Sequence, residues 1–308
     1  MTAQPGTPEP PASTAASTAM STAMSTAMRP RSPLLTPFVR SIGFDVGDEL
    51  PFRLEWSVPS GEVSLMVNLR EDEFRTYHGP EHAAVHRVGG AMLAGPRTEA
   101  SVIDTAEQRH VVAVSFEPGG AAPFFGVPLA QARDRLVDLG ELWGRDGAVL
   151  RERLLAAATP RQAAQIIETA LLGRIATAPA GDPARDPAAA GAVAFAVAAF
   201  ERGTPVSEVA ADLGLLPKRF ARLFHDRTGL TPKRFSRMHR LQRLLGAVHG
   251  RGTVNWAEVA AAHGYFDQAH LINDFRVITG LTPAAYLAAA GDAPNHIPLP
   301  HVPPPRRQ

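Results

Sequence analysis

The 308-residue sequence contains no cysteine. Disulfides, zinc sites built on thiolates, iron–sulfur clusters held by cysteine and cysteine nucleophiles are therefore excluded. Metal ions bound by histidine and carboxylate side chains remain compatible with this composition.

The sequence also lacks long apolar runs and the common catalytic signatures. No stretch approaches the roughly eighteen consecutive apolar residues that a membrane helix needs, and the N-terminus lacks the charged start and apolar core of a secretory signal. We therefore expect a cytoplasmic protein with no membrane partner. A G-x-S-x-G nucleophile elbow, a glycine-rich phosphate loop and an H-E-x-x-H helix are all absent, so we predict no catalytic residues.

Basic charge is concentrated in one part of the chain. The formal net charge is only +1, but residues 191–290 hold twelve Lys or Arg against seven Asp or Glu. Within them, the segment 218–243 contains nine basic residues and a single acid, Asp226. Such a block in a near-neutral chain indicates a polyanionic partner, and a merely solvated helix face is the alternative.

The two ends of the chain have little apolar bulk. Residues 1–32 are rich in Pro, Ser, Thr and Ala and contain S-T-A-M three times in succession. We predict a disordered leader with no part in a core, because burial cannot offset the entropy of ordering it. The repeats also make Met20, Met24 and Met28 alternative translation starts. The tail, residues 291–308, has six prolines and no apolar periodicity, and we predict that it is flexible.

Residues 33–176 predict a β-rich domain followed by helices. Alternating apolar and polar residues around Val63–Leu69 favour a half-buried strand, and 111–116 and 102–103 favour two more. Helical patterns follow at 129–139 and 148–158. Thr159 and Pro160 then suit the start of a helix that reaches about residue 175. Residues 177–190, rich in Ala, Pro, Gly and Asp, predict a linker.

Two segments of the C-terminal third repeat each other. The string V-A-A-D-L-G at 209–214 corresponds to V-A-A-A-H-G at 259–264, and T-G-L-T-P at 228–232 corresponds to T-G-L-T-P at 279–283. The offset grows from 50 to 51 residues, which places one extra residue in the second turn. Two copies are too few for a solenoid, so a paired motif explains the pattern better.

Each repeat predicts a helix-turn-helix unit. A short helix (207–213 or 257–263) ends at Gly214 or Gly264, where the chain must turn sharply and a positive φ is favoured. A second helix begins near Pro217 or Asp267. Large apolar residues of this second helix then face inward, and its polar residues face outward.

The outward residues are of the types that bind DNA. In the first unit they include Lys218, Arg219 and Arg222, and in the second they are Gln268, Ala269, His270 and Asn273. Arg, Lys, Gln and Asn are the side chains that contact base edges in a major groove. A long helix over 232–245 joins the units, and we expect Arg234, Arg237 and Arg240 on it to contact phosphates. The alternative is a helical bundle with solvated arginines.

Residues 191–290 resemble the C-terminal domain of the AraC/XylS family of bacterial regulators. The most specific strings are G-Y-F-D-Q-A-H-L-I-N-D-F at 264–275 and T-G-L-T-P-x-x-Y ending at Tyr286. The resemblance implies that Lys218 and Arg222, and then Gln268, Ala269 and Asn273, occupy base-facing positions. The family commonly has a small polar cap before the first recognition helix, where this sequence has Leu216.

The N-terminal motifs are less specific. G-P-R-T at 95–98, F-E-P-G-G at 116–120 and D-L-G-E-L-W-G at 138–144 look like the poorly characterised β-rich domain of many actinobacterial regulators of this family. That resemblance implies a sensor or dimerisation role. The aromatic residues Phe124, Phe125 and Trp143 favour a core over an apolar pocket.

Three histidines, His78, His82 and His86, are spaced by four residues. On a helix they would align as metal ligands, but Gly79 and Pro80 break a helix between the first two. His82 and His86 alone could still pair at i and i+4. We favour surface positions without metal, and predict no cofactor.

Together these features predict an α+β protein. Its domains are a leader at 1–32, a β-rich sensor or dimerisation domain with trailing helices at 33–176, a linker at 177–190, an all-α domain of two helix-turn-helix motifs at 191–290 and a tail at 291–308. We predict a one-component, sequence-specific transcription regulator. Double-stranded DNA and RNA polymerase are its expected partners, with a small-molecule effector and a second subunit as further ones. The alternatives are an enzyme with a metal- or small-molecule-converting β-barrel, and a C-terminal domain that only binds proteins.

Overall fold

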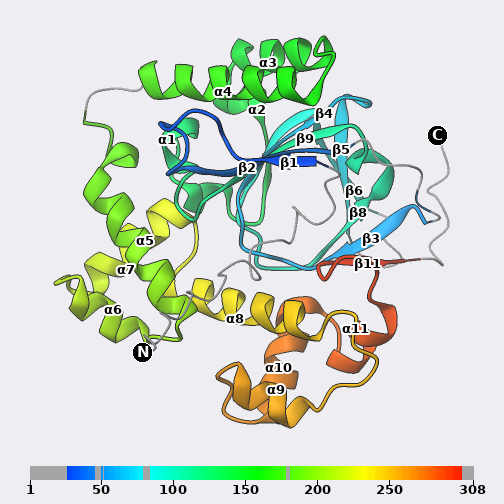
Figure 1. The fold of residues 1–308 in the computed structure, drawn as a ribbon, viewed down its shortest axis with the longest axis vertical. Helices are drawn as coiled ribbons and strands as arrows, with labels where there is room; N and C mark the ends of the chain where they lie inside the picture. Colours follow the sequence, from blue (N-terminus) through cyan, green and yellow to red (C-terminus); the bar gives the residue numbers. More distant parts are fainter. Residues whose placement is uncertain (1–25, 46–49, 51, 79–83, 178–180, 300–308) are drawn as a thin grey trace, which may run out of the picture.

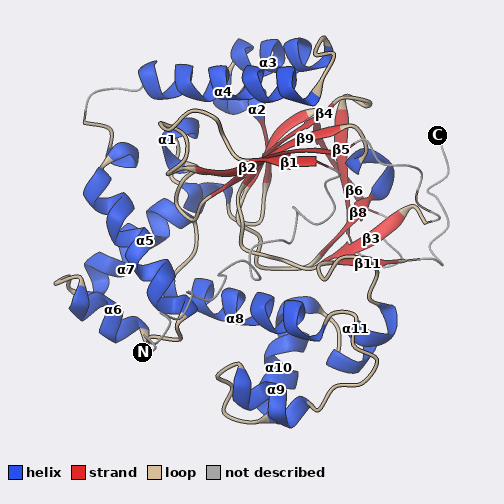
Figure 2. Ribbon diagram, viewed as in Figure 1, coloured by secondary structure: helices blue, strands red, loops and turns tan. Residues whose placement is uncertain are grey.

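The computed structural model describes residues 26–45, 50, 52–78, 84–177 and 181–299. Two antiparallel sheets make up most of the N-terminal part, and helices lie above, beside and below them (Figure 1). Figure 2 shows how strands give way to helices along the chain. The predicted α+β class is confirmed, with a β-rich domain and trailing helices followed by an all-α domain of two helix-turn-helix units.

The first sheet has six strands in the order β1-β2-β9-β4-β7-β10, and the second has five in the order β11-β3-β8-β5-β6. All their pairings are antiparallel. The strands are β1 (Thr26–Met28), β2 (Val39–Asp45), β3 (Leu54–Ser57), β4 (Ser64–Asn68), β5 (Glu73–His78), β6 (Ala84–Gly89), β7 (Ala91–Ala94), β8 (Ser101–Asp104), β9 (Val111–Phe116), β10 (Leu136–Asp138) and β11 (His296–Pro298).

Alternation along β4 explains the layers. Leu65 and Val67 are fully buried in the main core, which the first sheet shares with the helices above it. Met66 belongs instead to a smaller cluster with Phe74 of the second sheet. Because successive side chains of a strand point to opposite faces, β4 serves both layers and is more buried than the half-buried strand predicted for it.

Short helices cover the first sheet. They are α1 (Ala122–Phe125), α2 (Leu139–Trp143), α3 (Arg145–Leu155) and α4 (Pro160–Thr177), with 3-10 turns η2 (Thr105–Gln108) and η3 (Leu129–Ala132) between strands. Phe125 stacks on Trp143 at 5.6 Å between ring centroids, and the Trp143 indole donates to the Phe124 carbonyl over 2.9 Å. All three aromatic residues are buried, which agrees with the core interpretation of their sequence pattern.

Thr159 caps α4 as the sequence predicts, because its hydroxyl accepts from the Gln162 backbone N–H over 3.2 Å. The helix predicted over 129–139 is wrong. That segment forms η3 and then β10, whose three residues pair with β7. A backbone-paired edge strand overrides the local helical periodicity here.

The leader is not disordered throughout. Residues 26–28 form β1 against β2, and the backbone N–H groups of Arg31 and Ser32 donate to the Glu168 carboxylate on α4. The prediction of a disordered segment is therefore wrong for residues 26–32. Met20, Met24 and the other residues before 26 lie outside the described residues.

The tail also departs from its prediction. Residues 296–298 form β11, which pairs with β3 in the register His296↔Ser57, Ile297↔Trp56 and Pro298↔Glu55. The Leu299 N–H also donates to the Leu54 carbonyl. The flexible tail is therefore wrong for residues 291–299. Its prolines fit this position because β11 is an edge strand, where a missing N–H costs no ladder bond.

The histidines spaced by four residues do not lie on a helix in the described part of the chain. His78 lies on β5 and His86 on the neighbouring β6, where it is exposed, and His82 lies outside the described residues. Within the described part of the chain, no cluster of three His, Cys, Asp or Glu residues is placed to hold a metal ion.

The C-terminal helices form two units that share one long helix. After the 3-10 turn η4 (Pro183–Arg185) they are α5 (Pro187–Glu201), α6 (Val206–Asp212), α7 (Pro217–Thr228), α8 (Pro232–Val248), α9 (Trp256–Ala262), α10 (Gln268–Thr279) and α11 (Pro283–Ala289). The start of α8 contributes Phe235 to the core around α5, α6 and α7. Its remainder, Met238 to Val248, belongs to the core around α9, α10 and α11. One helix therefore fixes both units.

The ordered tail predicts a measurable effect of Ile297. Its side chain is 3% exposed and packs in the core of the second unit. Ile297→Ala should lower the free energy of unfolding by about 2–4 kcal/mol, the usual cost of such a truncation, in urea titrations. Leu34→Ala, at a side chain that is 68% exposed, is the control. A change as small as the control's would mean that the tail does not pack in solution.

Candidate nucleic-acid interface

The two helix-turn-helix units have the same backbone turn. Gly214 and Gly264 have φ of 62° and 71°, the left-handed region in which glycine carries no Cβ penalty. The next N–H then folds back onto the first helix of the unit: Leu215 donates to Ala210, and Tyr265 to Ala260, each over 3.0 Å. The repeat seen in the sequence is therefore a repeat of turn geometry.

The second helix of each unit buries one face and exposes the other. Phe220 and Phe224 on α7, and Leu271 and Phe275 on α10, are fully buried. Every residue predicted to contact bases is exposed, and these residues are Lys218, Arg219, Arg222, Gln268, Ala269, His270 and Asn273. The Arg222 side chain is 87% exposed and lies 3.6 Å from the Asp226 carboxylate. Such an exposed pair is weak, so Arg222 can leave it for another partner.

The two second helices differ at their first turn. Asp267 caps α10 by accepting from the His270 N–H over 2.7 Å. Leu216 occupies the cap position of α7 and accepts no such side-chain bond. The start of α7 relies instead on Pro217, whose missing N–H needs no partner.

Sequence reasoning missed two exposed apolar side chains at these turns. Leu216 is 76% exposed and Phe266 is 92% exposed. Both follow the turn glycine by two residues, so the repeat offset of 50 relates one to the other. The repeat offset could have revealed this pair of residues in the sequence. It places an apolar side chain next to the exposed face of the second helix in each unit.

The basic block of 218–243 divides into two groups. Arg227 donates to the Ala184 and Asp186 carbonyls, and Arg243 donates to the Glu201 carbonyl. These arginines hold neighbouring segments together. Five other cations of the block are exposed, and they are Lys218, Arg219, Arg222, Lys233 and Arg234.

Arg237 and Arg240 hold α8 against α10. Arg237 donates to the Asp274 carboxylate, and Arg240 lies 3.5 Å from its other oxygen. The Arg240 guanidinium also lies over the Tyr265 ring, 4.4 Å from its centroid. Asp274 is only 5% exposed. The structure thus places two of the three residues predicted for phosphates in a structural ion pair, and leaves Arg234 fully available.

His239 adds no charge to this surface at neutral pH. Burial, and then the nearby charges of Arg40 and Arg243, lower the pKa of His239 to about 4. Its ring stacks on Phe235 with centroids 4.1 Å apart. His239 is therefore a neutral packing group inside a basic helix.

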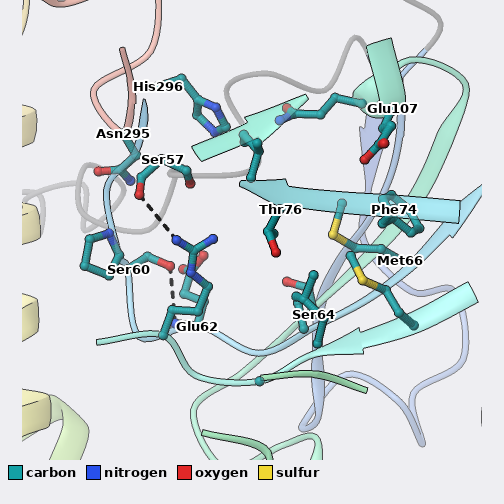
Figure 3. A pocket seen from close by; sticks show the side chains of 18 of the residues that line it. Ser57, Ser60, Glu62, Ser64, Met66, Phe74, Thr76, Glu107, Asn295 and His296 are labelled. Atoms are coloured by element: carbon teal, nitrogen blue, oxygen red, sulfur yellow. Dashed lines mark hydrogen bonds between the residues drawn. The ribbon is translucent and has the colours of Figure 1, made fainter. Parts of the chain in front are cut away.

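A pocket lies between the two sheets of the N-terminal part. It offers about 880 Å³ of space, some of it open to solvent. Ser64 and Met66 of β4 line it from one sheet, and Phe74 and Thr76 of β5 line it from the other. Figure 3 shows Asn295 and His296 beside Ser57 at one end, and Met66, Phe74 and Glu107 at the other. No pattern in the sequence indicates that the tail reaches this site.

The tail connects the pocket to the helices. The Asn295 side-chain amide donates to the Gln242 side-chain oxygen on α8 over 2.9 Å, and the Asn295 backbone carbonyl accepts from the Val58 N–H over 2.9 Å. Gln242 in turn donates to the Pro59 carbonyl over 2.8 Å. Trp56 on β3 also donates to Thr279 at the end of α10 over 2.7 Å. Several hydrogen bonds therefore connect the wall of the pocket directly to α8 and α10.

A crevice separates α7 from the N-terminal part. Gly126, Val127 and Pro128 line one side, and Arg222 and Asp226 line the other. Close packing continues past the end of α7. A Cβ on Gly229 would lie 2.5 Å from Pro96, so only glycine fits this contact.

Comparisons with known proteins agree with this geometry. Residues 201–289 match the family described as a helix-turn-helix domain, and residues 28–138 match a domain of unknown function, DUF6597. No curated protein matches the chain.

The chain is similar in fold to solved structures of ToxT from Vibrio cholerae. The structure from strain O395 has 10% identity and a TM-score of 0.41, and the match covers 80% of this chain and 97% of that one. The structure from strain SCE256 with a bound unsaturated fatty acid has 10% identity and a TM-score of 0.40, covering 80% and 95%.

The paired turns, the exposed basic face of α7 and the helix-turn-helix match define the class. Through this helix-turn-helix domain the chain is a DNA-binding transcription regulator. Within the described residues, no helix is long and apolar enough to span a membrane.

The ion pair at Asp274 predicts a stability effect. Asp274→Asn removes the charge that Arg237 and Arg240 share, and breaking a buried pair usually costs 3–5 kcal/mol. Because Arg237 is 36% exposed, solvent screening reduces the expected loss to about 1–3 kcal/mol. Urea titration measures it. Asp226→Asn, which alters the exposed pair with Arg222, is the matched control, and equal losses would contradict a structural role for Asp274.

Proposed function

We propose that the chain is an effector-controlled, sequence-specific regulator whose pocket between the sheets sets the state of the DNA-binding helices. One observation carries the proposal. Asn295 and His296 line the pocket, and the Asn295 amide is bonded to Gln242 on α8. A ligand that touches this end of the pocket thereby touches a segment bonded to the helix that both units share.

The same tail is fixed to the second unit from the other side. The Tyr286 hydroxyl of α11 donates to the Pro294 carbonyl over 2.9 Å, and Ile297 packs in the core of that unit. A ligand shifts an equilibrium only through different contacts in the two states. A tail shared by the pocket and the helices provides such a difference.

The first unit is coupled to the N-terminal part at α7. Arg222 faces the crevice whose opposite wall is formed by Gly126, Val127 and Pro128. The packing of Gly229 against Pro96 and Leu129 fixes the end of α7. We propose that effector binding changes this contact and with it the access of Arg222 to DNA.

The DNA contacts fall into two groups in this proposal. Lys218, Arg219 and Arg222 of α7, with Gln268, Ala269, His270 and Asn273 of α10, face the bases in successive major-groove segments about one helical turn apart. Lys233 and Arg234 contact phosphates, while Arg237 and Arg240 hold α10 in position. Leu216 and Phe266 suit apolar contact with thymine methyl groups.

The further partners follow from this role. We propose RNA polymerase as the partner through which bound protein alters transcription, and a second copy of the chain as a partner on paired half-sites. The proposed place of action is the cytoplasm. The enzyme alternative draws no support from the family match, which concerns DNA binding. Stoichiometric metal in the purified protein, lost on changing His82 and His86, would favour it.

If Arg222 contacts a base, its loss weakens binding to the specific site more than binding to random DNA. Arg222→Ala should weaken binding to the specific site by about 1–3 kcal/mol and change binding to random duplex much less. The specific site is taken from the fragment upstream of the protein's own gene that binds most tightly. Fluorescence anisotropy of labelled DNA, titrated with protein, measures both affinities. Arg234→Ala should weaken binding to both DNAs and lower the salt slope by about 1.

Arg70→Ala, at an exposed arginine of the β-rich part, is the control and should leave both affinities unchanged. Equal losses on specific and random DNA for Arg222→Ala would contradict base contact by this residue.

A further inference from the structure

Arg227 lies where three parts of the chain meet. It belongs to α7 and is only 5% exposed. Its two Nη atoms donate to the backbone carbonyls of Ala184 and Asp186 in the linker. Its stem lies beside the turn that follows β9, because a Cβ on Gly119 would be 3.7 Å from the Arg227 Cβ. One side chain of α7 therefore contacts both the linker and the β-rich part.

The linker has a defined shape at this contact. The Asp182 carboxylate caps η4 by accepting from the Ala184 N–H over 2.9 Å. The Asp186 carboxylate caps α5 by accepting from the Ala188 N–H, also over 2.9 Å. Each cap satisfies an N–H group that the first turn of a helix leaves without a partner. The two capped turns follow each other directly, so the linker presents both carbonyls to one guanidinium in a fixed direction.

The helix-turn-helix fold does not require an arginine at this position. The repeat offset of 51 residues, which relates Phe224 to Phe275, also relates Arg227 to Ile278. Ile278 is buried and packs in the core of the second unit. An apolar side chain therefore suffices for packing, and the arginine of the first unit serves its contacts with the linker.

Ion pairing does not account for the arginine either. Among the described residues, no carboxylate oxygen lies within 4.0 Å of its guanidinium, and Asp186 and Asp182 act on it only from a greater distance. Burial lowers the pKa of Arg227, because a buried charge without a paired anion costs free energy. What an arginine supplies is direction, since its planar guanidinium binds two acceptors in one fixed geometry.

Holding Arg227 in one direction also fixes the direction of Arg222. The two residues are five positions apart on α7, which places them about 140° apart around the helix, and both line the crevice beside the β-rich part. A contact with a base edge is sensitive to rotation of the helix, since its two hydrogen bonds must align together. A contact with a phosphate is less sensitive, because it depends mainly on charge.

We propose that Arg227 is a positioning residue for base recognition: it fixes the rotation of α7 relative to the linker and the β-rich part. The inference rests on the proposed function, because it requires that α7 contacts bases. It names the residue through which the position of the linker reaches that helix. Figure 1 shows α5 and α7 together on the side of the molecule where the linker descends from α4.

Arg227→Met tests the residue, because it removes both donors and keeps an unbranched side chain that suits a buried site. Fluorescence anisotropy with the full chain measures affinity for the specific site and for a random duplex. The ratio of the two affinities should fall about two- to thirty-fold, the range expected for a residue that acts through another. The melting temperature should stay near that of the unmodified chain, because a buried charge is also removed. An unchanged ratio would overturn the proposal.

Arg243→Met is the matched control. Arg243 also donates to a backbone carbonyl, that of Glu201 at the end of α5, but this bond lies within the helical domain and does not involve the linker. Its loss should leave the ratio of specific to random affinity unchanged. An equal fall of the ratio in both variants would show a general loosening of the helices and would overturn the assignment to Arg227.

Asp186→Ala tests the linker without changing α7. Asp186 is exposed, and its loss removes the cap of α5 beside a carbonyl that Arg227 binds. The affinity ratio should fall in this variant too, and hydrogen exchange over residues 182–190 should become faster in both Asp186→Ala and Arg227→Met. Asp138→Ala, which removes the cap of α2 in the β-rich part, should change neither quantity. Unchanged hydrogen exchange in Arg227→Met would show that Arg227 does not hold the linker, and the proposal would fail.

Arg222→Ala on the same two DNAs separates this inference from the proposed function. If Arg222→Ala lowers the ratio and Arg227→Met does not, α7 contacts bases without this positioning, and only the inference on Arg227 fails. If neither variant lowers the ratio, base contact by α7 fails, and the proposed function loses its first recognition helix.

Discussion

Backbone pairing between β11 and β3 is the constraint on which the rest of the structure depends. Three residue pairs connect the end of the chain to the second sheet, although the whole DNA-binding domain lies between this strand and the β-rich part. The pairing brings Asn295 to Gln242 and His296 to Glu55, 2.9 and 2.7 Å apart. Without it, the pocket would lose one wall and the helices would lose a direct connection to that wall.

The shared helix α8 has a similar role inside the DNA-binding domain. Its apolar residues complete both helical cores, and its arginines carry different tasks on different faces. Arg234 is exposed, whereas Arg237 and Arg240 neutralise the buried Asp274. Positive charge therefore serves both DNA binding and the mutual position of the two units, and the sequence alone does not separate these uses.

Local patterns predicted the parts of the structure that depend on local physics. Alternation predicted β4, the apolar run at 111–116 predicted β9, and the turn glycines Gly214 and Gly264 adopt the positive φ that their position requires. Residues 129–139 were predicted as helix because their periodicity is helical, but pairing with β7 makes three of them a strand. Edge pairing of this kind depends on residues distant in sequence.

Some residues of the candidate DNA-binding site were likewise predictable from local patterns, and others were not. The exposed face of α7 follows from the spacing of Phe220 and Phe224, so its outward residues were predictable. The partners of Arg237 and Arg240 were not, because Asp274 lies more than thirty residues further along the chain. The same holds for the tail at the pocket, since its proline content predicts flexibility and its contacts with β3 and α8 are entirely long-range.

Binding of the full chain to fragments of its own upstream region tests the central claim most directly, at two salt concentrations and with random competitor DNA. The account predicts retention on one fragment despite competitor, with affinity that falls steeply as salt rises. Retention that competitor removes equally from all fragments, or no retention at low salt, would contradict a sequence-specific regulator.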